Sequence, residues 1–308
     1  METRHLISIH DLTSRQVQEL FGLASRIKAD PDSFRQALAG KTLAMIFQKS
    51  STRTRVSFEV GMFQLGGHAL FLSRRDIQLG RGETISDTAR VLSRYVDGIM
   101  ARTFAHQDVV DLARFGSVPV INGLTDDLHP CQALADYFTL HEIFGRIEGR
   151  KIAYVGDGNN MARSLLFGAA KVGMDIALAS PPGYEVGGAY LDLARRDARD
   201  AGTQIELSSD PHAAVRGASA VYTDVWASMG QEEEAEKRLR AFEGYMVDEE
   251  LMSAADRDAV FLHCLPCHRG EEVSAEVADG PSSRIFDQAE NRLHLQKAVL
   301  VWAMGQAG

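Results

Sequence analysis

The chain has 308 residues, of which 45% are hydrophobic and 24% charged, with a formal net charge of −9 at pH 7 and an isoelectric point near 5.6. This length is enough for two domains that each bury a hydrophobic core. The acidic balance argues against a nucleic-acid-binding protein and against an anionic membrane surface as partner, because both would require a basic face.

The sequence carries no signal for export or membrane insertion. Residues 1–9 have neither the apolar core of a secretory signal nor the basic, acid-poor composition of an organellar transit peptide. No run of 18 apolar residues occurs, so no transmembrane helix is expected. The three cysteines are an odd and small number, which is typical of a reducing compartment. We therefore expect a cytoplasmic protein.

Short apolar runs alternate with helical patterns along the whole chain. In the first half, strands are expected at 42–47, 68–72, 98–101 and 119–122, and helices at 56–65, 84–95 and 107–115. In the second half, strands are expected at 151–156, 175–179, 204–207, 220–223 and 260–263, and helices at 161–172, 188–201 and 232–242. Alternation at this spacing predicts an α/β protein with two domains, each a parallel β-sheet flanked by helices.

An apolar helix at 133–144 and the link that follows it mark the expected boundary between the domains. We predict a first domain over residues 1–133 and a second over 134–288. The last amphipathic run is expected to pack back on the first domain, which adds about 289–308 to it. Ligands of parallel sheets bind beyond the carboxyl ends of the strands, so the residues after each strand are the candidates for function.

The segment Ser50 to Arg55 places hydroxyl and guanidinium groups where the first strand turns into the first helix. A helix N-terminus offers free backbone N–H groups and the positive end of the helix dipole, and the added side chains complete a receptor for a dianion. The alternative is that Ser and Thr only cap the helix while both arginines face water. Neither Gly-Lys-Thr nor a Gly-rich loop is present, which favours a small phosphorylated molecule over a nucleoside triphosphate.

Polar residues also follow later strands. Arg102 and His129 come after two strands of the first half, where together they would donate hydrogen bonds to a carbonyl oxygen beside a phosphate. Taken alone, Arg102 is more often a surface cation and His129 more often a helix-start residue. The loop 76–83 has the composition of a lid or interface loop. Asp224 follows a buried strand and precedes a Ser-Met-Gly loop, a position from which a carboxylate can bind an ammonium group.

Two other motifs are ambiguous. Gly156 to Met161 matches only the first two glycines of a dinucleotide-binding fingerprint, so a nicotinamide-dependent dehydrogenase is a weak alternative, and a glycine turn with an Asn cap is an equal one. Cys264 to His268 matches C-x-x-C-H, but covalent haem conflicts with the absence of a secretory signal, and structural zinc would require a second ligand pair. A metal-binding or structural protein, a catalytic thiol and a buried core thiol all remain open at this point.

Four motifs taken together resemble the aspartate/ornithine carbamoyltransferase family. They are Ser-Thr-Arg-Thr at 51–54, His-Pro-Cys-Gln at 129–132, Asp224 with Ser-Met-Gly at 228–230, and His-Cys-Leu-Pro at 263–266. The segment 286–292 is similar to the closing motif of the family, so the resemblance covers essentially the whole chain in order. The first two motifs are shared by both branches, whereas the last two are typical of enzymes that use ornithine.

The resemblance implies a set of site residues and an assembly. Carbamoyl phosphate would be bound by Ser51, Thr52, Arg53, Thr54, Gln78, Arg102, His129, Gln132 and Arg292. Ornithine would be bound by Asn160, Asp224, Ser228, Met229, Cys264 and Leu265. Family members are trimers or multiples of trimers with active sites at subunit interfaces, which implies a homo-oligomer in which a neighbouring subunit contributes Gln78. The resemblance also implies a cis peptide between Leu265 and Pro266, and it assigns no role to Cys267.

The implied reaction transfers the carbamoyl group of carbamoyl phosphate to the δ-amine of L-ornithine, giving citrulline and phosphate, as in arginine biosynthesis. Asp224 and Cys264 would orient and deprotonate the amine, while Arg102 and His129 would donate to the carbamoyl oxygen. We expect neither a cofactor nor a metal. The alternative within the family is another acceptor amine, such as putrescine or N-acetylornithine.

Overall fold

The computed structural model describes residues 3–74, 82–227 and 234–305. The chain divides into two compact units, one formed by Met1–Ala135 with Asn291–Gly308 and the other by Asp136–Glu290. Helices α5 (Pro130–Phe144) and α12 (Ile285–Met304) each have residues in both units. Among the described residues, none of the helices combines the length and apolar character that a membrane span requires.

The first unit contains a parallel sheet whose described strands run in the order β2-β1-β3-β4. The strands are β1 (Thr42–Phe47), β2 (His68–Ser73), β3 (Gly98–Arg102) and β4 (Val120–Leu124). The helical segments are α1 (Ser14–Ala29), the 3₁₀ turn η1 (Asp32–Phe34), α2 (Thr52–Gln64), α3 (Ile85–Leu92) and α4 (His106–Phe115). Strand β1 is buried from Leu43 to Phe47, as expected of a parallel strand covered on both faces.

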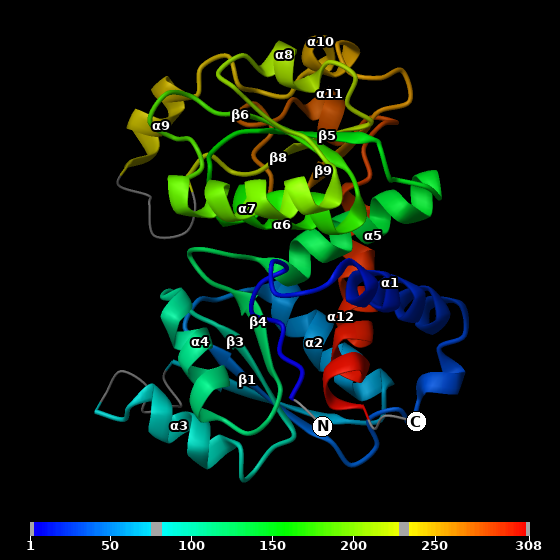
Figure 1. Cartoon of the computed structure of the whole chain (residues 1–308), viewed down its shortest axis with the longest axis vertical. Coiled ribbons are helices and arrows are strands. Elements are labelled where there is room, and N and C mark those ends of the chain that lie inside the picture. Colours follow the sequence, from blue (N-terminus) through cyan, green and yellow to red (C-terminus); the bar gives the residue numbers. More distant parts are fainter. Residues whose placement is uncertain (1–2, 75–81, 228–233, 306–308) are drawn as a thin grey trace. The chain divides into compact units, whose positions relative to one another are not determined.

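Helices cover both faces of this sheet, as Figure 1 shows. On one face, α3 and α4 lie side by side, and Ala89 and Leu112 pack in one cluster with the inward side chains Ile46 and Ile99 of the strands. Helices α2 and α12 are packed against each other, since Lys297 of α12 donates a hydrogen bond to Gln64 of α2. The sheet is therefore the middle layer of an α/β sandwich.

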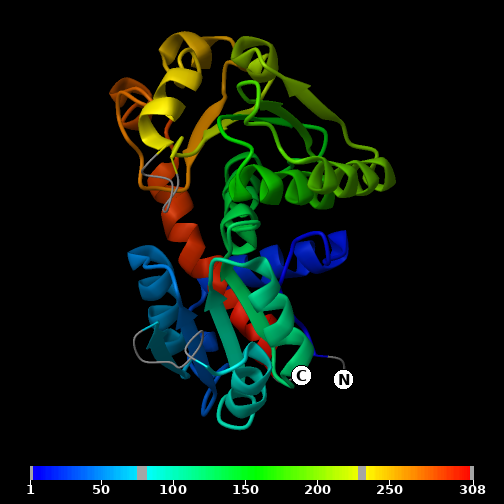
Figure 2. The same cartoon turned by 90° about the vertical axis from the view of Figure 1, so that its left-hand side faces the viewer.

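The second unit contains a parallel sheet whose described strands run in the order β7-β6-β5-β8-β9. The strands are β5 (Lys151–Val155), β6 (Asp175–Ala179), β7 (Ile205–Ser208), β8 (Ala220–Thr223) and β9 (Val260–His263). The helices are α6 (Asn160–Val172), α7 (Gly188–Ala201), α8 (Pro211–Val215), α9 (Ala235–Ala241), α10 (Glu249–Ser253) and α11 (Ala275–Ala278). Within this unit, α6 and α7 run side by side along one face of the sheet, and α8 and α10 lie beyond the other (Figures 1 and 2).

These observations confirm the predicted fold class of two parallel α/β sheets flanked by helices. The sequence patterns did not predict helix α1. Its start is fixed by a capping box between Thr13 and Gln16. The helix expected at 232–242 is observed as Ala235–Ala241, and residues 228–233 lie outside the described part of the chain.

Candidate active site

In the first unit, the carboxyl ends of neighbouring strands bring three predicted segments to one edge of the sheet. Phe47 and Arg102, the last residues of β1 and β3, are partners in the parallel register, and Gln48 N–H donates to the carbonyl of Arg102 at 2.8 Å. β4 lies next to β3, so the segment that leads to His129 leaves the sheet at this same edge. The strand order therefore explains why residues far apart in the sequence share one site.

Helix α2 begins at this edge with Ser51 as its N-cap. The Ser51 hydroxyl accepts a hydrogen bond from Thr54 N–H at 3.2 Å, so the capping role considered from the sequence is confirmed for this serine. Thr52 and Arg53 are exposed, whereas Thr54 is buried. The helix thus presents its first turn, with the positive end of its dipole, to a ligand.

Three buried side chains from distant parts of the chain meet behind this helix start. Arg292 donates through Nη2 to Thr54 Oγ1 at 3.3 Å and through Nη1 to Gln132 Oε1. Each of the three is at most 4% exposed. A guanidinium fixed by two polar partners keeps its charge and its planar orientation in a buried position.

Positive charge is concentrated around His129. Burial lowers the pKa of His129 well below its usual value, and the guanidiniums of Arg292, Arg102 and Arg53 lower that pKa further. The imidazole is therefore neutral at physiological pH. It can donate or accept a hydrogen bond beside three cations without adding a fourth charge.

A cavity of about 410 Å³ opens at the same helix start and is lined partly by Ser51 and Thr52. Arg55, which also lines it, lies over the Phe71 ring at 3.7 Å from the centroid and pairs with Glu59 at 3.0 Å. Of the two arginines in the motif, Arg55 is therefore already engaged within the unit. The cavity provides polar groups and room for a small anion beside the N-terminus of α2.

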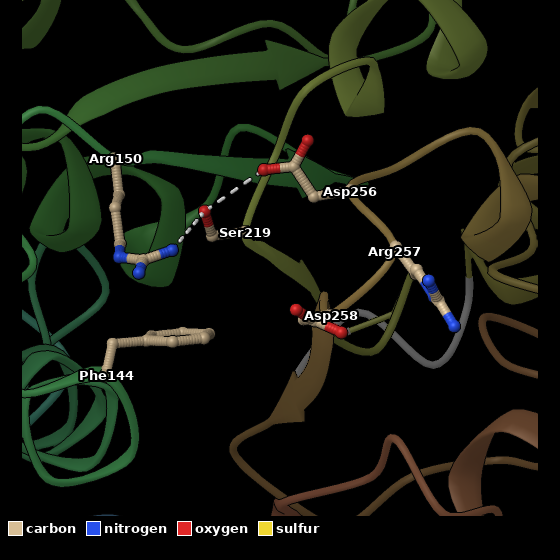
Figure 3. A pocket seen from close by; sticks show the side chains of 6 residues that line it. All are labelled: Phe144, Arg150, Ser219, Asp256, Arg257 and Asp258. Atoms are coloured by element: carbon tan, nitrogen blue, oxygen red, sulfur yellow. Dashed lines mark hydrogen bonds between the residues drawn. The ribbon is translucent and has the colours of Figure 1, made fainter.

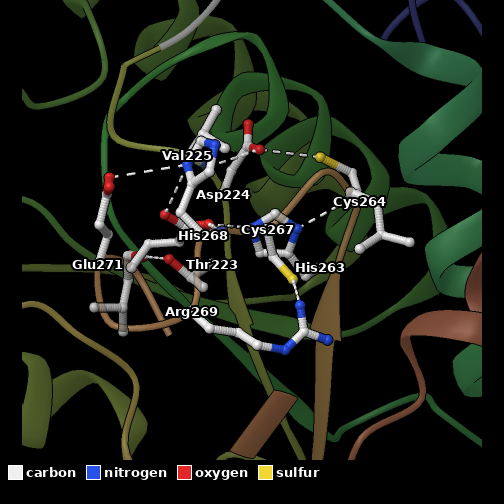
Figure 4. Close-up of polar contacts among 12 residues, drawn as sticks. Thr223, Asp224, Val225, His263, Cys264, Cys267, His268, Arg269 and Glu271 are labelled. Carbon is white, nitrogen blue, oxygen red and sulfur yellow. Dashed lines mark hydrogen bonds and ion pairs between the residues drawn. The ribbon is translucent and has the colours of Figure 1, made fainter. Parts of the chain in front are cut away.

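In the second unit, the site is built around Asp224, the residue that follows β8. Thr223 and His263 are partners in the register of β8 and β9, so the next residues, Asp224 and Cys264, leave the sheet together. The Cys264 thiol donates to Asp224 Oδ1 at 3.0 Å, as Figure 4 shows. Two further donors reach the carboxylate: Val225 N–H and Asn159 Nδ2, both at 2.9 Å. A carboxylate held by three donors has a fixed orientation.

Asn159 is a partner that the sequence analysis did not assign to Asp224. It is the N-cap of α6, and its Oδ1 accepts from the backbone N–H groups of Met161 and Ala162. Its Oδ1 also accepts from Tyr154 Oη at 3.3 Å. Burial raises the pKa of Tyr154 well above its usual value, and the charge of Asp224 raises it further, so the phenol stays a donor.

The glycines before this cap serve the backbone turn. Gly156 has φ 151°, a conformation that favours glycine, and a Cβ on Gly158 would lie 2.3 Å from the backbone N of Val186. Both requirements arise from the local fold. They agree with the glycine-turn interpretation of this segment.

The His-Cys-Leu-Pro turn is held by the ring of His263. Leu265 N–H donates to His263 Nδ1 at 2.9 Å, and His263 Nε2 lies 3.3 Å from Glu272 Oε1. His263 and Glu272 are both fully buried, and Leu265 has a positive φ of 60°. The peptide between Leu265 and Pro266 is cis, as the family resemblance implied.

Two groups of side chains in the described residues have atoms close enough to share a metal ion: Asp224 with His263 and Cys264, and His268 with Glu271 and Glu272. In the first group, both ring nitrogens of His263 face other partners, Leu265 N–H and Glu272. The geometry of the first group therefore favours a hydrogen-bonded thiol and carboxylate over a metal centre.

The other cysteines have different surroundings. Cys131 is fully buried, burial raises the pKa of its thiol to about 12, and the thiol donates to the Asn122 carbonyl at 3.4 Å. Cys267 is partly buried, and burial also raises its pKa. Neither environment activates a thiolate nucleophile.

A separate cavity of about 240 Å³ lies at the opposite edge of the second sheet, where β5, β8 and β9 begin. Figure 3 shows its polar lining, in which Arg150 donates to Ser219 and Ser219 donates to Asp256 at 3.3 and 3.4 Å. Arg150 also lies over the Phe144 ring. Its place at the amino ends of the strands separates this cavity from the Asp224 site.

Two family models match consecutive parts of the chain. The model described as "Aspartate/ornithine carbamoyltransferase, carbamoyl-P binding domain" matches residues 4–142, and "Aspartate/ornithine carbamoyltransferase, Asp/Orn binding domain" matches residues 148–303. The chain belongs to the aspartate/ornithine carbamoyltransferase family. The family predicted from the motifs is thereby confirmed.

Named relatives within this family are similar over nearly the full chain. The ornithine carbamoyltransferase of Bacillus subtilis is 55% identical over 297 residues, which cover 96% of this chain and 92% of that protein. A Pyrococcus furiosus protein named "Ornithine carbamoyltransferase, anabolic" is 54% identical over 304 residues, covering 98% and 96%. A solved structure of ornithine carbamoyltransferase from P. furiosus has a TM-score of 0.95 at 53% identity and covers 100% of both chains.

The residues singled out by the family resemblance fall into two sets in the structure. Those expected to bind carbamoyl phosphate lie in the first unit: Ser51, Thr52, Arg53, Thr54, Arg102, His129, Gln132 and Arg292. Those expected to bind ornithine lie in the second: Asn160, Asp224, Cys264 and Leu265. Gln78, Ser228 and Met229, with most of the loop 76–83, lie outside the described residues.

The charge run 231–240 is typical of a solvated helix face, and its described charged residues Glu234, Glu236, Lys237 and Arg240 are exposed. Arg238 differs from them, because it is only 7% exposed. Its Nη1 donates to Asp157 Oδ2 at 2.8 Å and to the Trp226 carbonyl at 2.9 Å. Alternation of charges along the sequence does not distinguish an exposed arginine from one whose partner is 81 residues away.

Proposed function

We propose that this protein is an ornithine carbamoyltransferase, which transfers the carbamoyl group of carbamoyl phosphate to the δ-amine of L-ornithine. The observation that carries the proposal is the contact between Cys264 and Asp224, made by the His-Cys-Leu-Pro turn beside a strand-end carboxylate. This contact occurs in a chain that matches the family's carbamoyl-phosphate and Asp/Orn domain models in order.

The first unit supplies the groups for carbamoyl phosphate. The exposed first turn of α2, with Ser51, Thr52 and Arg53, would bind the phosphate through N–H, hydroxyl and guanidinium groups. Arg292, held by Thr54 and Gln132, adds a fixed positive charge. Arg102 and neutral His129 would donate to the carbamoyl oxygen, which becomes more negative as the carbamoyl carbon is attacked.

The second unit supplies the groups for ornithine. An aliphatic amine has a pKa of about 10.4 and arrives protonated at neutral pH, so the δ-amine must lose a proton before it attacks. Asp224 would hold the ammonium and Cys264 would contact the acceptor beside it, with Asn160, Ser228, Met229 and Leu265 forming the rest of the pocket. Asp224 would accept the proton that the ammonium loses, and the amine nitrogen then forms a bond to the carbamoyl carbon. The bond from that carbon to the phosphate oxygen breaks, and phosphate leaves with the bonding electrons and takes up the second proton released by the nitrogen.

We propose that the protein forms a homotrimer or a multiple of trimers, in which a neighbouring subunit supplies Gln78 to the carbamoyl-phosphate site. Support comes from the outer side of the first unit, where Val56 and Phe63 of α2 are 50% and 81% exposed. The neighbouring β2 is an edge strand of its sheet and exposes Leu70. Large exposed apolar side chains next to a sheet edge are typical of an interface.

We place the reaction in the cytoplasm, in the biosynthetic direction. The cysteines Cys131, Cys264 and Cys267 form no disulfide bond in the described residues, which suits a reducing compartment. The biosynthetic direction rests on the similarity to the P. furiosus relative whose name includes "anabolic".

The experiment that tests the function measures product formation from carbamoyl phosphate with four acceptors offered separately: ornithine, putrescine, N-acetylornithine and aspartate. We expect citrulline from ornithine and at least about a hundredfold lower kcat/KM with the other three acceptors. A buried site whose polar groups pair with one substrate rejects an analogue that leaves those groups without a partner. Product with a different amine would retain the carbamoyl-phosphate site and overturn the acceptor assignment. No product with any acceptor would overturn the function.

A further inference from the structure

A second group of potential ligands lies on the surface of the second unit, in the segment after the His-Cys-Leu-Pro turn. His268 Nδ1 is 3.9 Å from Glu271 Oε2 and 3.5 Å from Glu272 Oε2. One ligand atom from each residue lies within 4.8 Å of the others. Figure 4 shows the Glu271 carboxylate directed toward the His268 ring.

A tight turn creates this arrangement. Glu271 N–H donates to the His268 carbonyl at 3.0 Å, and His268 N–H donates to Glu272 Oε1 at 2.5 Å. Gly270 within the turn has φ 90°, which favours glycine. The turn thus brings the side chains of Glu271 and Glu272, three and four residues after His268, to the same side as the His268 ring.

Glu272 distinguishes this group from an ordinary cluster of exposed acids. It is fully buried, and its Oε1 already faces His263 Nε2 and accepts from His268 N–H. Its Oε2 is also buried and accepts no hydrogen bond from the described residues. This oxygen faces His268 Nδ1 at 3.5 Å. A buried carboxylate oxygen that accepts no hydrogen bond is costly unless a cation compensates its charge.

The donor set selects the kind of cation. Ligand atoms bound tetrahedrally to one ion at about 2.0–2.2 Å lie about 3.3–3.6 Å apart. The His268 to Glu272 distance of 3.5 Å lies in that range, and the exposed side chains of His268 and Glu271, at 52% and 48%, have room to adjust. One imidazole nitrogen and two carboxylates suit zinc or cobalt better than magnesium, which prefers oxygen ligands and retains its waters.

We propose that His268 Nδ1, Glu271 and Glu272 Oε2 form a binding site for a divalent transition-metal ion of the zinc type, with water as the remaining ligand. The site lies outside the groups assigned to carbamoyl phosphate and ornithine and does not depend on the proposed transferase function. Cys267 is not a ligand, because its thiol accepts from Arg269 at 3.5 Å and lies outside the group.

The test uses the full-length protein freed of metal with a chelator and titrated with Co²⁺, followed by visible absorption and by calorimetry. We expect one bound ion with the visible bands of a nitrogen- and oxygen-ligated cobalt and without sulfur-to-cobalt charge transfer. His268→Ala and Glu271→Gln each remove an exposed ligand and should weaken binding at least tenfold, since even outer-shell changes at metal sites cost about 10–100-fold. Zn²⁺ should displace the cobalt.

His212→Ala is the matched control, because His212 is an exposed histidine of the same unit that belongs to neither group of potential ligands in the described residues. It should bind cobalt as the unchanged protein does, and thermal unfolding should show all three variants to be folded. Three outcomes would overturn the proposal: no cobalt bound, cobalt bound equally well after His268→Ala, or a sulfur-ligated spectrum that places the ion at Cys264.

Discussion

Three hydrogen-bond donors from separate segments of the chain orient the Asp224 carboxylate. Asn159, Val225 and Cys264 all reach its two oxygens at 2.9–3.0 Å, and none of them is a cation. These three donors therefore orient the carboxylate without pairing it with a cation. Its nearest sulfur, Cys264, is the residue through which the acceptor assignment can be tested most directly.

We predict that Cys264→Ala keeps the fold and lowers kcat/KM for ornithine by about 10–100-fold, because it removes the thiol that donates to Asp224. A hydrogen bond to a charged group contributes about 1.5–3 kcal/mol, and each 1.4 kcal/mol corresponds to a factor of ten. Steady-state kinetics in the presence of a chelator measures the change, with Cys267→Ala, whose thiol accepts from Arg269, as the control. Unchanged kcat and KM in Cys264→Ala would mean that the thiol only fills space.

His129 gives the first unit a specific dependence on pH. The pKa of the buried imidazole lies well below its usual value, whereas the unfolded chain has the ordinary pKa of about 6.5. Below that pH the unfolded state binds more protons than the folded state, so stability is lost as pH falls from about 6.5. Burial lowers the pKa of His5 and His106 too, and they contribute in the same direction.

We predict that His129→Asn reduces the loss of thermal stability between about pH 7.5 and about pH 5.5, because it removes the largest of these three contributions. The melting temperature is compared at both pH values for the unchanged protein, His129→Asn and the exposed-site control His212→Asn. The control should keep the full pH dependence. An identical pH dependence in His129→Asn would show that the imidazole does not resist protonation in the folded state.

At the scale of elements, the short helix α9 is joined to the loop after β5 by a buried ion pair. The side chains of Arg238 and Asp157 are 8% and 12% exposed. Burial raises the pKa of Asp157, and the Arg238 guanidinium lowers it. Arg238 also binds the Trp226 carbonyl and lies over the Tyr184 ring. Arg238 therefore ties α9 to the loop after β5 and to the backbone of Trp226.

We predict that Arg238→Met destabilises the protein by about 3–5 kcal/mol, because it leaves the Asp157 carboxylate buried without its cation. The same change at Arg240 should cost less than about 1 kcal/mol, since its pair with Glu236 is almost fully exposed at 85% and 93%. Urea unfolding of the two variants of α9 provides the comparison. Equal stabilities would contradict a structural role for the Asp157 pair.

At the scale of the whole molecule, the assembly is expected to depend on the apolar side of α2. Phe63, 81% exposed, is the most exposed large apolar side chain among the described residues. Its burial against another subunit would stabilise a trimer by the hydrophobic effect, and a charge there would oppose association.

We predict that Phe63→Glu converts the proposed trimer to monomers and lowers activity, whereas Leu239→Glu, at an exposed apolar position in the second unit, leaves the assembly unchanged. Light scattering coupled to size-exclusion chromatography gives the masses. A trimer of unchanged stability in Phe63→Glu would place the interface elsewhere. A monomeric unchanged protein would overturn the assembly itself.

The sequence alone determined the two parallel α/β sheets and the family, because both depend on local patterns. Apolar runs such as Thr42–Phe47, covered on both faces, form parallel strands, and function gathers in the residues that follow them. The fold class and the family are confirmed, and the cis peptide at Leu265 agrees with the structure. The assignment of individual residues to substrates, and of the domain boundaries, stays a prediction.

Only the tertiary structure decided which side chains meet and which are buried. Thr54 and Arg292 are 238 residues apart, and Asn159 and Asp224 are 65 apart, so no local pattern reports their contacts. Arg238 stands in a run of charges that is typical of a solvated surface, yet it is buried. Burial and pairing depend on the strand order that brings distant segments together, and that order is set by packing of the whole chain rather than by the sequence near any one residue.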